Sequence, residues 1–72
     1  MNPASMSILK ALRKHTVIAK RDMPVYIGYS EITIRNSLKV LLDLKYVEFY
    51  VRGQSKYYSL TLPGIRAAKL IS

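Results

Sequence analysis

The sequence predicts a small α+β domain in which a long helix is followed by a β-hairpin, and three patterns support this. Apolar side chains recur at Ile34, Leu38 and Leu41, and these spacings of four and three residues lie on one face of a helix. Between residues 47 and 51 apolar and polar side chains alternate instead, which is typical of a strand. Gly53 then begins a plausible two-residue turn, so this strand and the segment after the turn are expected to form a hairpin.

The chain is short and strongly basic. Residues 1–72 are expected to form a single domain, and they carry 12 Lys and Arg against 4 Asp and Glu, a formal net charge of +8. So high a charge favours a polyanion as the partner. The basic residues are scattered along the chain and do not form the one-sided stripe of a helix that lies on a membrane. Because 50% of the residues are hydrophobic, we expect a folded basic domain and not a disordered basic tail.

The composition gives no support to several functional classes. The sequence contains no cysteine and a single histidine, His15, so neither a disulfide framework nor a metal site is expected. No cofactor or small-molecule ligand is expected either. An enzyme is the least favoured class, because the sequence has no His–carboxylate cluster and no phosphate-binding loop. No apolar run reaches the ~20 residues of a membrane span, and the N-terminus lacks the layout of a signal peptide. The expected location is therefore the cytoplasm, or the host cytoplasm if the source is viral.

Shorter elements are expected before the long helix. They are a first helix over residues 3–14, a short strand over residues 16–18 and a second helix over residues 23–27. Asn2 suits the N-cap of the first helix, and Pro3 suits its first helical position. Asp22 is expected to cap the second helix, and Gly28 to end it in the left-handed conformation.

The long helix, expected over residues 30–45, presents two different sides. Ser30 suits its N-cap, and only Tyr29 separates this cap from Gly28, so the two helices form a helix-turn-helix pattern. The inner side carries the apolar stripe and the stem of Lys45. The outer side and its flank carry groups that can address base edges and a thymine methyl group, from Ile32, Thr33, Arg35, Asn36 and Lys39. The alternative is a core helix with an ordinary solvated face.

The residues after the long helix predict a hairpin and a last helix. With Gly53 and Gln54 as a type II′ turn, the cross-strand pairs join like faces, Val47 with Leu60, Phe49 with Tyr58 and Tyr50 with Tyr57. The tip of the hairpin then presents Arg52, Gln54, Ser55 and Lys56. Thr61 suits the N-cap of a last helix from Leu62, with an apolar stripe of Ile65, Ala68 and Ile71.

In this arrangement the sequence resembles the winged helix-turn-helix family over essentially residues 5–70. The resemblance rests on a Ser/Thr-capped helix, an apolar pair that opens the wing, and a tyrosine-leucine-threonine-x-x-glycine signature where the wing leads into the last helix. The matching residues are Thr33, Ile34, Leu38, Leu41, Tyr46, Val47, Tyr58, Leu60, Thr61 and Gly64. One departure is Lys45, where the family usually has glycine, and it concerns how tightly the chain leaves the long helix.

The resemblance implies a winged helix-turn-helix domain in the order helix, strand, helix, helix, hairpin wing, helix, with a three-stranded antiparallel sheet. It also implies that the long helix enters the major groove and that the wing, residues 51–57, touches the backbone or the minor groove. Phosphates are expected near Tyr29 and Ser30, where the helix begins. The implied base-reading residues are Ile32, Thr33, Arg35, Asn36 and Lys39, and the implied wing contacts are Arg52, Gln54 and Lys56.

The leading hypothesis is a sequence-specific, double-stranded-DNA-binding transcription regulator, similar to the small regulators of archaeal viruses and plasmids. A homodimer is expected at least on DNA, because one recognition helix reads only a few base pairs. Its candidate surfaces are the wide apolar arc of the first helix around Met6 and Ile8, and the end of the last helix around Leu70. Two alternatives stay open. One is a nonspecific architectural or plasmid-maintenance protein that coats DNA through charge, and the other is a winged-helix module that docks on another protein.

Overall fold

The computed structural model describes residues 1–71, which form helices on one side of a small sheet. The elements are α1 (Pro3–His15), β1 (Val17–Ala19), the 3₁₀ helix η1 (Lys20–Asp22), α2 (Met23–Ile27), α3 (Glu31–Asp43), β2 (Val47–Arg52), β3 (Ser55–Leu60) and α4 (Leu62–Ile71). The strands form a 3-stranded antiparallel sheet in the order β1-β3-β2. The predicted fold class and the predicted order of elements are therefore confirmed.

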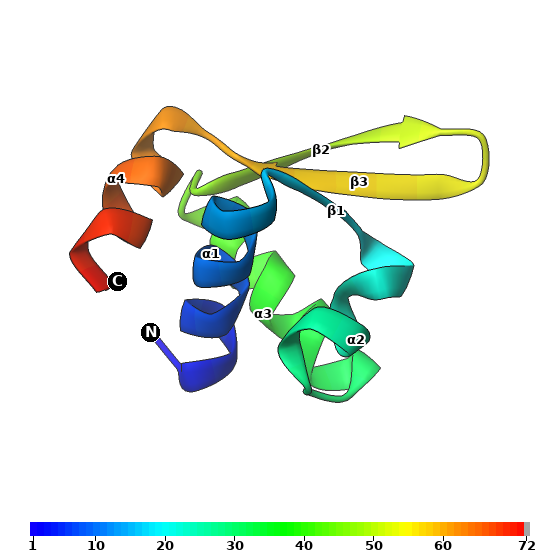
Figure 1. The fold of residues 1–72 in the computed structure, drawn as a ribbon, viewed down its shortest axis with the longest axis horizontal. Helices are drawn as coiled ribbons and strands as arrows, with labels where there is room; N and C mark the ends of the chain where they lie inside the picture. The colour runs from blue at the N-terminus through cyan, green and yellow to red at the C-terminus, as the bar shows by residue number, and fades with distance from the viewer. Residues whose placement is uncertain (72) are drawn as a thin grey trace.

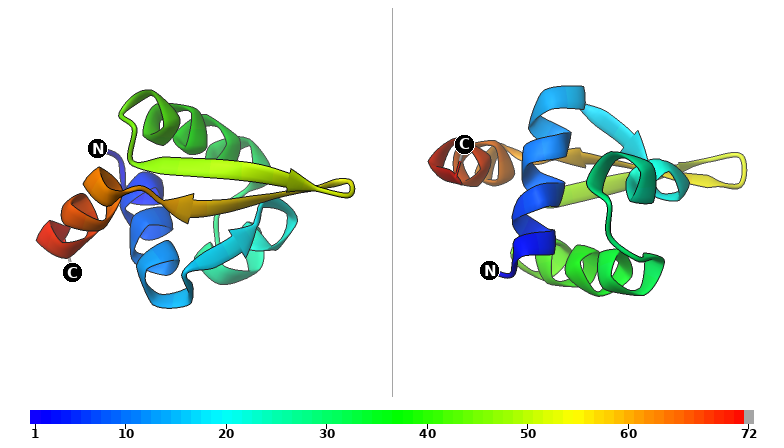
Figure 2. Two further views of the ribbon diagram at one scale, coloured as in Figure 1. Left: turned by 90° about the horizontal axis from the view of Figure 1, so that it is seen from above. Right: turned by 60° about the horizontal axis from the view of Figure 1, so that its bottom comes forward.

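The hairpin of β2 and β3 extends beyond the body of the molecule. In Figure 1, α1, α2 and α3 lie on one side of the sheet, and α4 lies at the end away from the hairpin tip. Both ends of the described chain lie near α4 in Figures 1 and 2. The wing and the chain termini thus occupy opposite ends of the domain.

The core fixes how α3 is rolled about its axis. Ile34, Leu38 and Leu41 are buried, as their spacing predicted. They belong to one cluster with residues from the other helices and all three strands, Ile8, Leu9, Leu12, Ile18, Met23, Val47, Tyr58 and Ala68. Since this stripe faces inward, the opposite side of α3 faces solvent.

The hairpin has the predicted register. Phe49 pairs with Tyr58, with ring centroids 5.5 Å apart, and Tyr50 pairs with Tyr57, with ring centroids 5.3 Å apart. Gly53 has a φ of 63°, the positive value that a type II′ turn needs at its first central position. The turn and the side-chain alternation therefore agree on a single pairing.

The exit from α3 differs from the prediction. The helix ends at Asp43 and not at residue 45, because Lys45 has a φ of 64°. The N–H groups of Lys45 and Tyr46 donate to the carbonyls of Leu42 and Leu41, both at 3.0 Å, which is the Schellman arrangement. The stem of Lys45 consequently does not extend the inner stripe, and the residue is exposed. The chain leaves α3 as tightly as it would with glycine.

Two other expected boundaries were wrong by one residue, and one expected cap is absent. α1 continues through His15 and β1 begins at Val17, because Thr16 has a φ of 72° and belongs to neither element. Asp22 does not cap α2. It ends the turn η1 in a helical conformation, and its side chain makes no capping hydrogen bond.

The start of α4 is fastened to the end of α3. The hydroxyl of Thr61 accepts from the N–H of Gly64 at 3.1 Å and donates to the carbonyl of Lys45. A Cβ on Gly64 would lie 1.8 Å from the carbonyl oxygen of Tyr46, so this close approach requires glycine. Gly64 therefore takes the inward position, and Ile65 is 38% exposed and does not head the expected apolar stripe.

Candidate nucleic-acid interface

The first turn of α3 is ordered by its own side chains. The hydroxyl of Ser30 accepts from the backbone N–H of Thr33 at 3.3 Å and donates to the hydroxyl of Thr33 at 3.0 Å. Both predicted contact residues are thus engaged with each other, and Thr33 is half-buried. Tyr29 precedes the cap and is 36% exposed. Ser30 therefore acts first as the cap that fixes where the helix begins.

The exposed side of α3 has two parts. Glu31, Arg35 and Lys39 follow one another at intervals of four residues, and all three line the space between α3 and its neighbours. Ile32 and Asn36 form the adjacent row, and both are exposed, Ile32 by 64%. Four of the five predicted base readers, all but Thr33, therefore lie open to solvent on this helix.

A groove separates α3 from the wing. We call it the α3–wing groove, with a volume of about 250 Å³ and a lining of Lys20, Arg35, Leu38, Lys39, Leu42, Phe49, Lys56 and Tyr58. The ammonium group of Lys56 lies 5.0 Å from the centroid of the Phe49 ring, so the cation is held on the groove side of the hairpin. Burial raises the pKa of the Tyr58 phenol above its usual range. The groove thus has an uncharged floor and cationic walls.

Lys20 and Arg21 also lie beside α3 and the wing, although the sequence did not single them out. Lys20 lines the α3–wing groove and two further cavities, of about 160 and 430 Å³, that adjoin α3 and the wing tip. A guanidinium N–H of Arg21 donates to the hydroxyl of Ser55 and ties η1 to the wing. The pairing of Ala19 with Tyr57 explains this, because it directs the residues after β1 toward the tip. An adjacent Lys-Arg pair just before a helix-turn-helix pattern was the available signal.

The wing residues do not all face the same way. Lys56 faces α3, and Gln54 lines a cavity with Lys20 and Glu31. Arg52 lies three residues after Phe49 on the same strand, so strand alternation places it on the opposite face of the hairpin. Of the three predicted wing contacts, Lys56 lies beside the cations of α3, Gln54 lies beside Lys20 and Glu31, and Arg52 lies on the other face.

Within residues 1–71, no group of three or more His, Cys, Asp and Glu side chains is placed to hold a metal ion. Over the same described residues, no helix combines the length and apolar character needed to cross a membrane. What the described surface offers is a groove lined by Lys20, Arg35, Lys39 and Lys56, beside an exposed helix.

Solved structures similar to this chain include DNA-binding regulators. MarR from E. coli, as a C80S mutant complexed with operator DNA, superposes with a TM-score of 0.87 at 15% identity, over 99% of this chain and 53% of that one. The chain has the winged-helix fold. BpsR from Bordetella bronchiseptica, whose DNA binding is regulated by 6-hydroxynicotinic acid, gives a TM-score of 0.91 at 20% identity, over 99% of this chain and 52% of that one. MepR, a transcription regulator of the Staphylococcus aureus multidrug efflux pump MepA, gives 0.86 at 22% identity, over 99% and 55%.

The winged-helix chain spans about half the length of these three regulators. No protein-family model matches its sequence. A search of curated proteins finds no significant match either.

Proposed function

We propose that this winged-helix chain binds double-stranded DNA and regulates transcription. The observation that carries the proposal is the α3–wing groove, where Lys20, Arg35, Lys39 and Lys56 line the space between an exposed helix and a hairpin. An α-helix fits the major groove of B-DNA. With α3 in the major groove and the wing on the backbone or in the minor groove, the sugar-phosphate strand between them would enter the α3–wing groove and meet Lys20 and Lys56.

In this proposal the side chains divide into two roles. Arg35 can offer its fork to guanine O6 and N7, and Asn36 can pair with adenine N6 and N7. Ile32, which is 64% exposed, can contact a thymine methyl group. The cations Lys20, Arg21 and Lys56 would position the backbone and carry no sequence information, while Lys39 stays with the proposed base readers. Tyr29, Gln54 and Arg52 would lie at the rim of the interface.

We also propose that the chain acts as a homodimer on DNA. Two surfaces were candidates, and α1 is the weaker one because Ile8 is fully buried and Met6 is half-buried in the core of the monomer. On α4, Leu70 is 87% exposed and Leu62 is 62% exposed. α4 lies at the opposite end from the wing tip (Figure 2), so pairing there would leave both wings free.

The competing function is a nonspecific architectural or plasmid-maintenance protein, which the number of lysines in the groove favours. Selection of bound sequences from a random duplex pool, at stated salt, separates the possibilities. A regulator enriches one motif over successive rounds, whereas a protein that binds through charge alone enriches none. A protein-docking module would retain no duplex at all. Two further proposals go with the regulator hypothesis. They are a cytoplasmic location and a relationship to the regulators of archaeal viruses and plasmids.

A further inference from the structure

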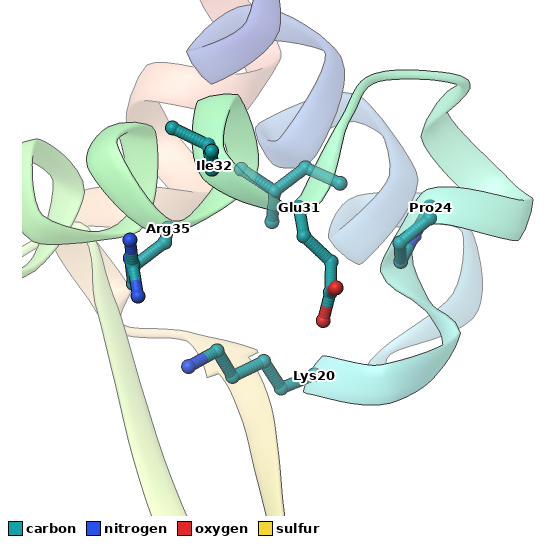
Figure 3. A pocket seen from close by; sticks show the side chains of 6 residues that line it. Lys20, Pro24, Glu31, Ile32 and Arg35 are labelled. Atoms are coloured by element: carbon teal, nitrogen blue, oxygen red, sulfur yellow. The ribbon is translucent and has the colours of Figure 1, made fainter.

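One acidic side chain lies among the cations of the proposed interface. Glu31, the first residue of α3, lines a cavity with Lys20, Ile32 and Arg35, and it lines a second cavity with Lys20 and Lys56. In Figure 3 its carboxylate extends toward Lys20, and the guanidinium of Arg35 lies along the same pocket. Glu31 is thus placed where a phosphate or a base edge would approach α3.

The other carboxylates lie elsewhere. Asp22 lies 4.0 Å from Nε of Arg21, and Asp43 is the last residue of α3, at the far end from Glu31. Glu48 pairs with Ser59 in the hairpin, and strand alternation places it on the face away from α3. Among the acidic residues, Glu31 alone lines the cavities beside the start of α3.

Glu31 makes no ion pair within residues 1–71. Over residues 1–71, no Lys, Arg or His nitrogen lies within 4.0 Å of its carboxylate. Arg35 is four residues further along the helix, a spacing that permits an ion pair, yet the two side chains stay apart. The carboxylate only accepts hydrogen bonds, and a DNA phosphate has no donor to offer it, so the two groups repel each other.

We propose that Glu31 is a specificity residue of the DNA interface, an inference that rests on the proposed function. Its carboxylate opposes binding wherever it meets phosphates without a hydrogen-bond donor. The opposition is relieved where a base offers an exocyclic amino group in the major groove, as cytosine does through N4 and adenine through N6. Glu31 therefore discriminates through repulsion as well as through attraction, and weakens binding to unselected DNA.

The test compares wild type with Glu31→Gln and with Glu48→Gln, which removes the same charge from the opposite face of the wing. Each protein is titrated with the selected duplex and with a random duplex at the same salt, after circular dichroism has verified its fold. Glu31→Gln should bind the random duplex more tightly, by about threefold to tenfold, and should discriminate less between the two duplexes. Glu48→Gln should raise affinity for both duplexes by a smaller, equal factor.

A second arm identifies the base. Single cytosines or adenines of the selected site are replaced by analogues that lack only the 4-amino or the 6-amino group. At one position the analogue should lower the affinity of wild type by about tenfold and that of Glu31→Gln by little. Whether that analogue replaces a cytosine or an adenine identifies the base that Glu31 contacts. The inference is overturned if wild type prefers the selected duplex but Glu31→Gln discriminates equally well. If wild type binds no duplex, the proposed function itself fails.

Discussion

Lys45 adopts a left-handed conformation that usually belongs to glycine, and two backbone hydrogen bonds at the end of α3 accompany it. Its φ is 64°, and its N–H and that of Tyr46 close the end of α3. A side chain with a Cβ is disfavoured in this left-handed region. The strain at Lys45 is therefore a local cost of the tight exit that sets the start of β2.

Lys45→Gly should stabilise the domain by about 1 kcal/mol, because it removes the strained Cβ and keeps both backbone hydrogen bonds. The free energy of unfolding from urea titration measures the effect. Lys45→Ala is the control, since it removes the same charge and stem but retains a Cβ. A gain as large in the alanine variant would mean that charge, and not backbone strain, is responsible.

Single substitutions in the proposed interface should distinguish residues that read bases from residues that hold the DNA backbone. Arg35→Ala and Asn36→Ala should each cost ~1–3 kcal/mol on the selected duplex and much less on a random one. Lys56→Ala should weaken binding to both duplexes alike and lower the slope of affinity against salt by about one. Titrations of both duplexes over a range of salt measure these effects. Equal losses on both duplexes for Arg35→Ala and Asn36→Ala would rule out their role as base readers.

At the scale of elements, α4 depends on a contact that leaves no room for a side chain. Gly64→Ala would place a methyl group 1.8 Å from the carbonyl oxygen of Tyr46, so α4 would have to move off the α3 exit. We expect a loss of about 1–3 kcal/mol in the free energy of unfolding, measured by thermal or urea denaturation. Arg66→Ala, an exposed change on the same helix, should alter stability by under about 0.5 kcal/mol. Tolerance of Gly64→Ala at wild-type stability would contradict the packing described.

Periodicity and turn chemistry predicted the elements, and tertiary contacts decided the exceptions. The stripe of Ile34, Leu38 and Leu41 and the glycine turn of the hairpin were readable because each is a local pattern. The cap at Asp22 failed because a 3₁₀ turn already brings the chain into a helical conformation before α2. Ile65 was assigned to the core because sequence spacing does not reveal that Gly64 must face Tyr46.

At the scale of the whole molecule, only part of the candidate site could be predicted from the sequence. Most side chains of α3 could be assigned from the helix itself, since one side was known to be buried. Lys20 reaches the same groove only because β1 pairs with β3, which the local pattern around residues 16–22 does not encode. Arg52 was grouped with the tip, but strand alternation turns it away from α3.

Dimerisation would double the surface that contacts DNA. We expect two chains to bind two half-sites about one helical turn, ~34–36 Å, apart. Sedimentation of complexes with one or two half-sites should show two-to-one binding on the longer duplex. Leu70→Glu should reduce this pairing and leave binding to a single half-site unchanged, because Leu70 is 87% exposed on α4 and far from the wing. Strict one-to-one binding, with no gain from a second half-site, would exclude the dimer.

The central claim is that the face formed by η1, α3 and the wing receives duplex DNA. Amide chemical-shift mapping during titration with the selected duplex tests it directly, because it reports every element at once. The largest shifts should fall on residues 20–21, 30–39 and 52–56, and α4 should change little at a duplex with a single half-site. Shifts that concentrate on α1 and α4, with α3 and the wing tip unchanged, would contradict the account.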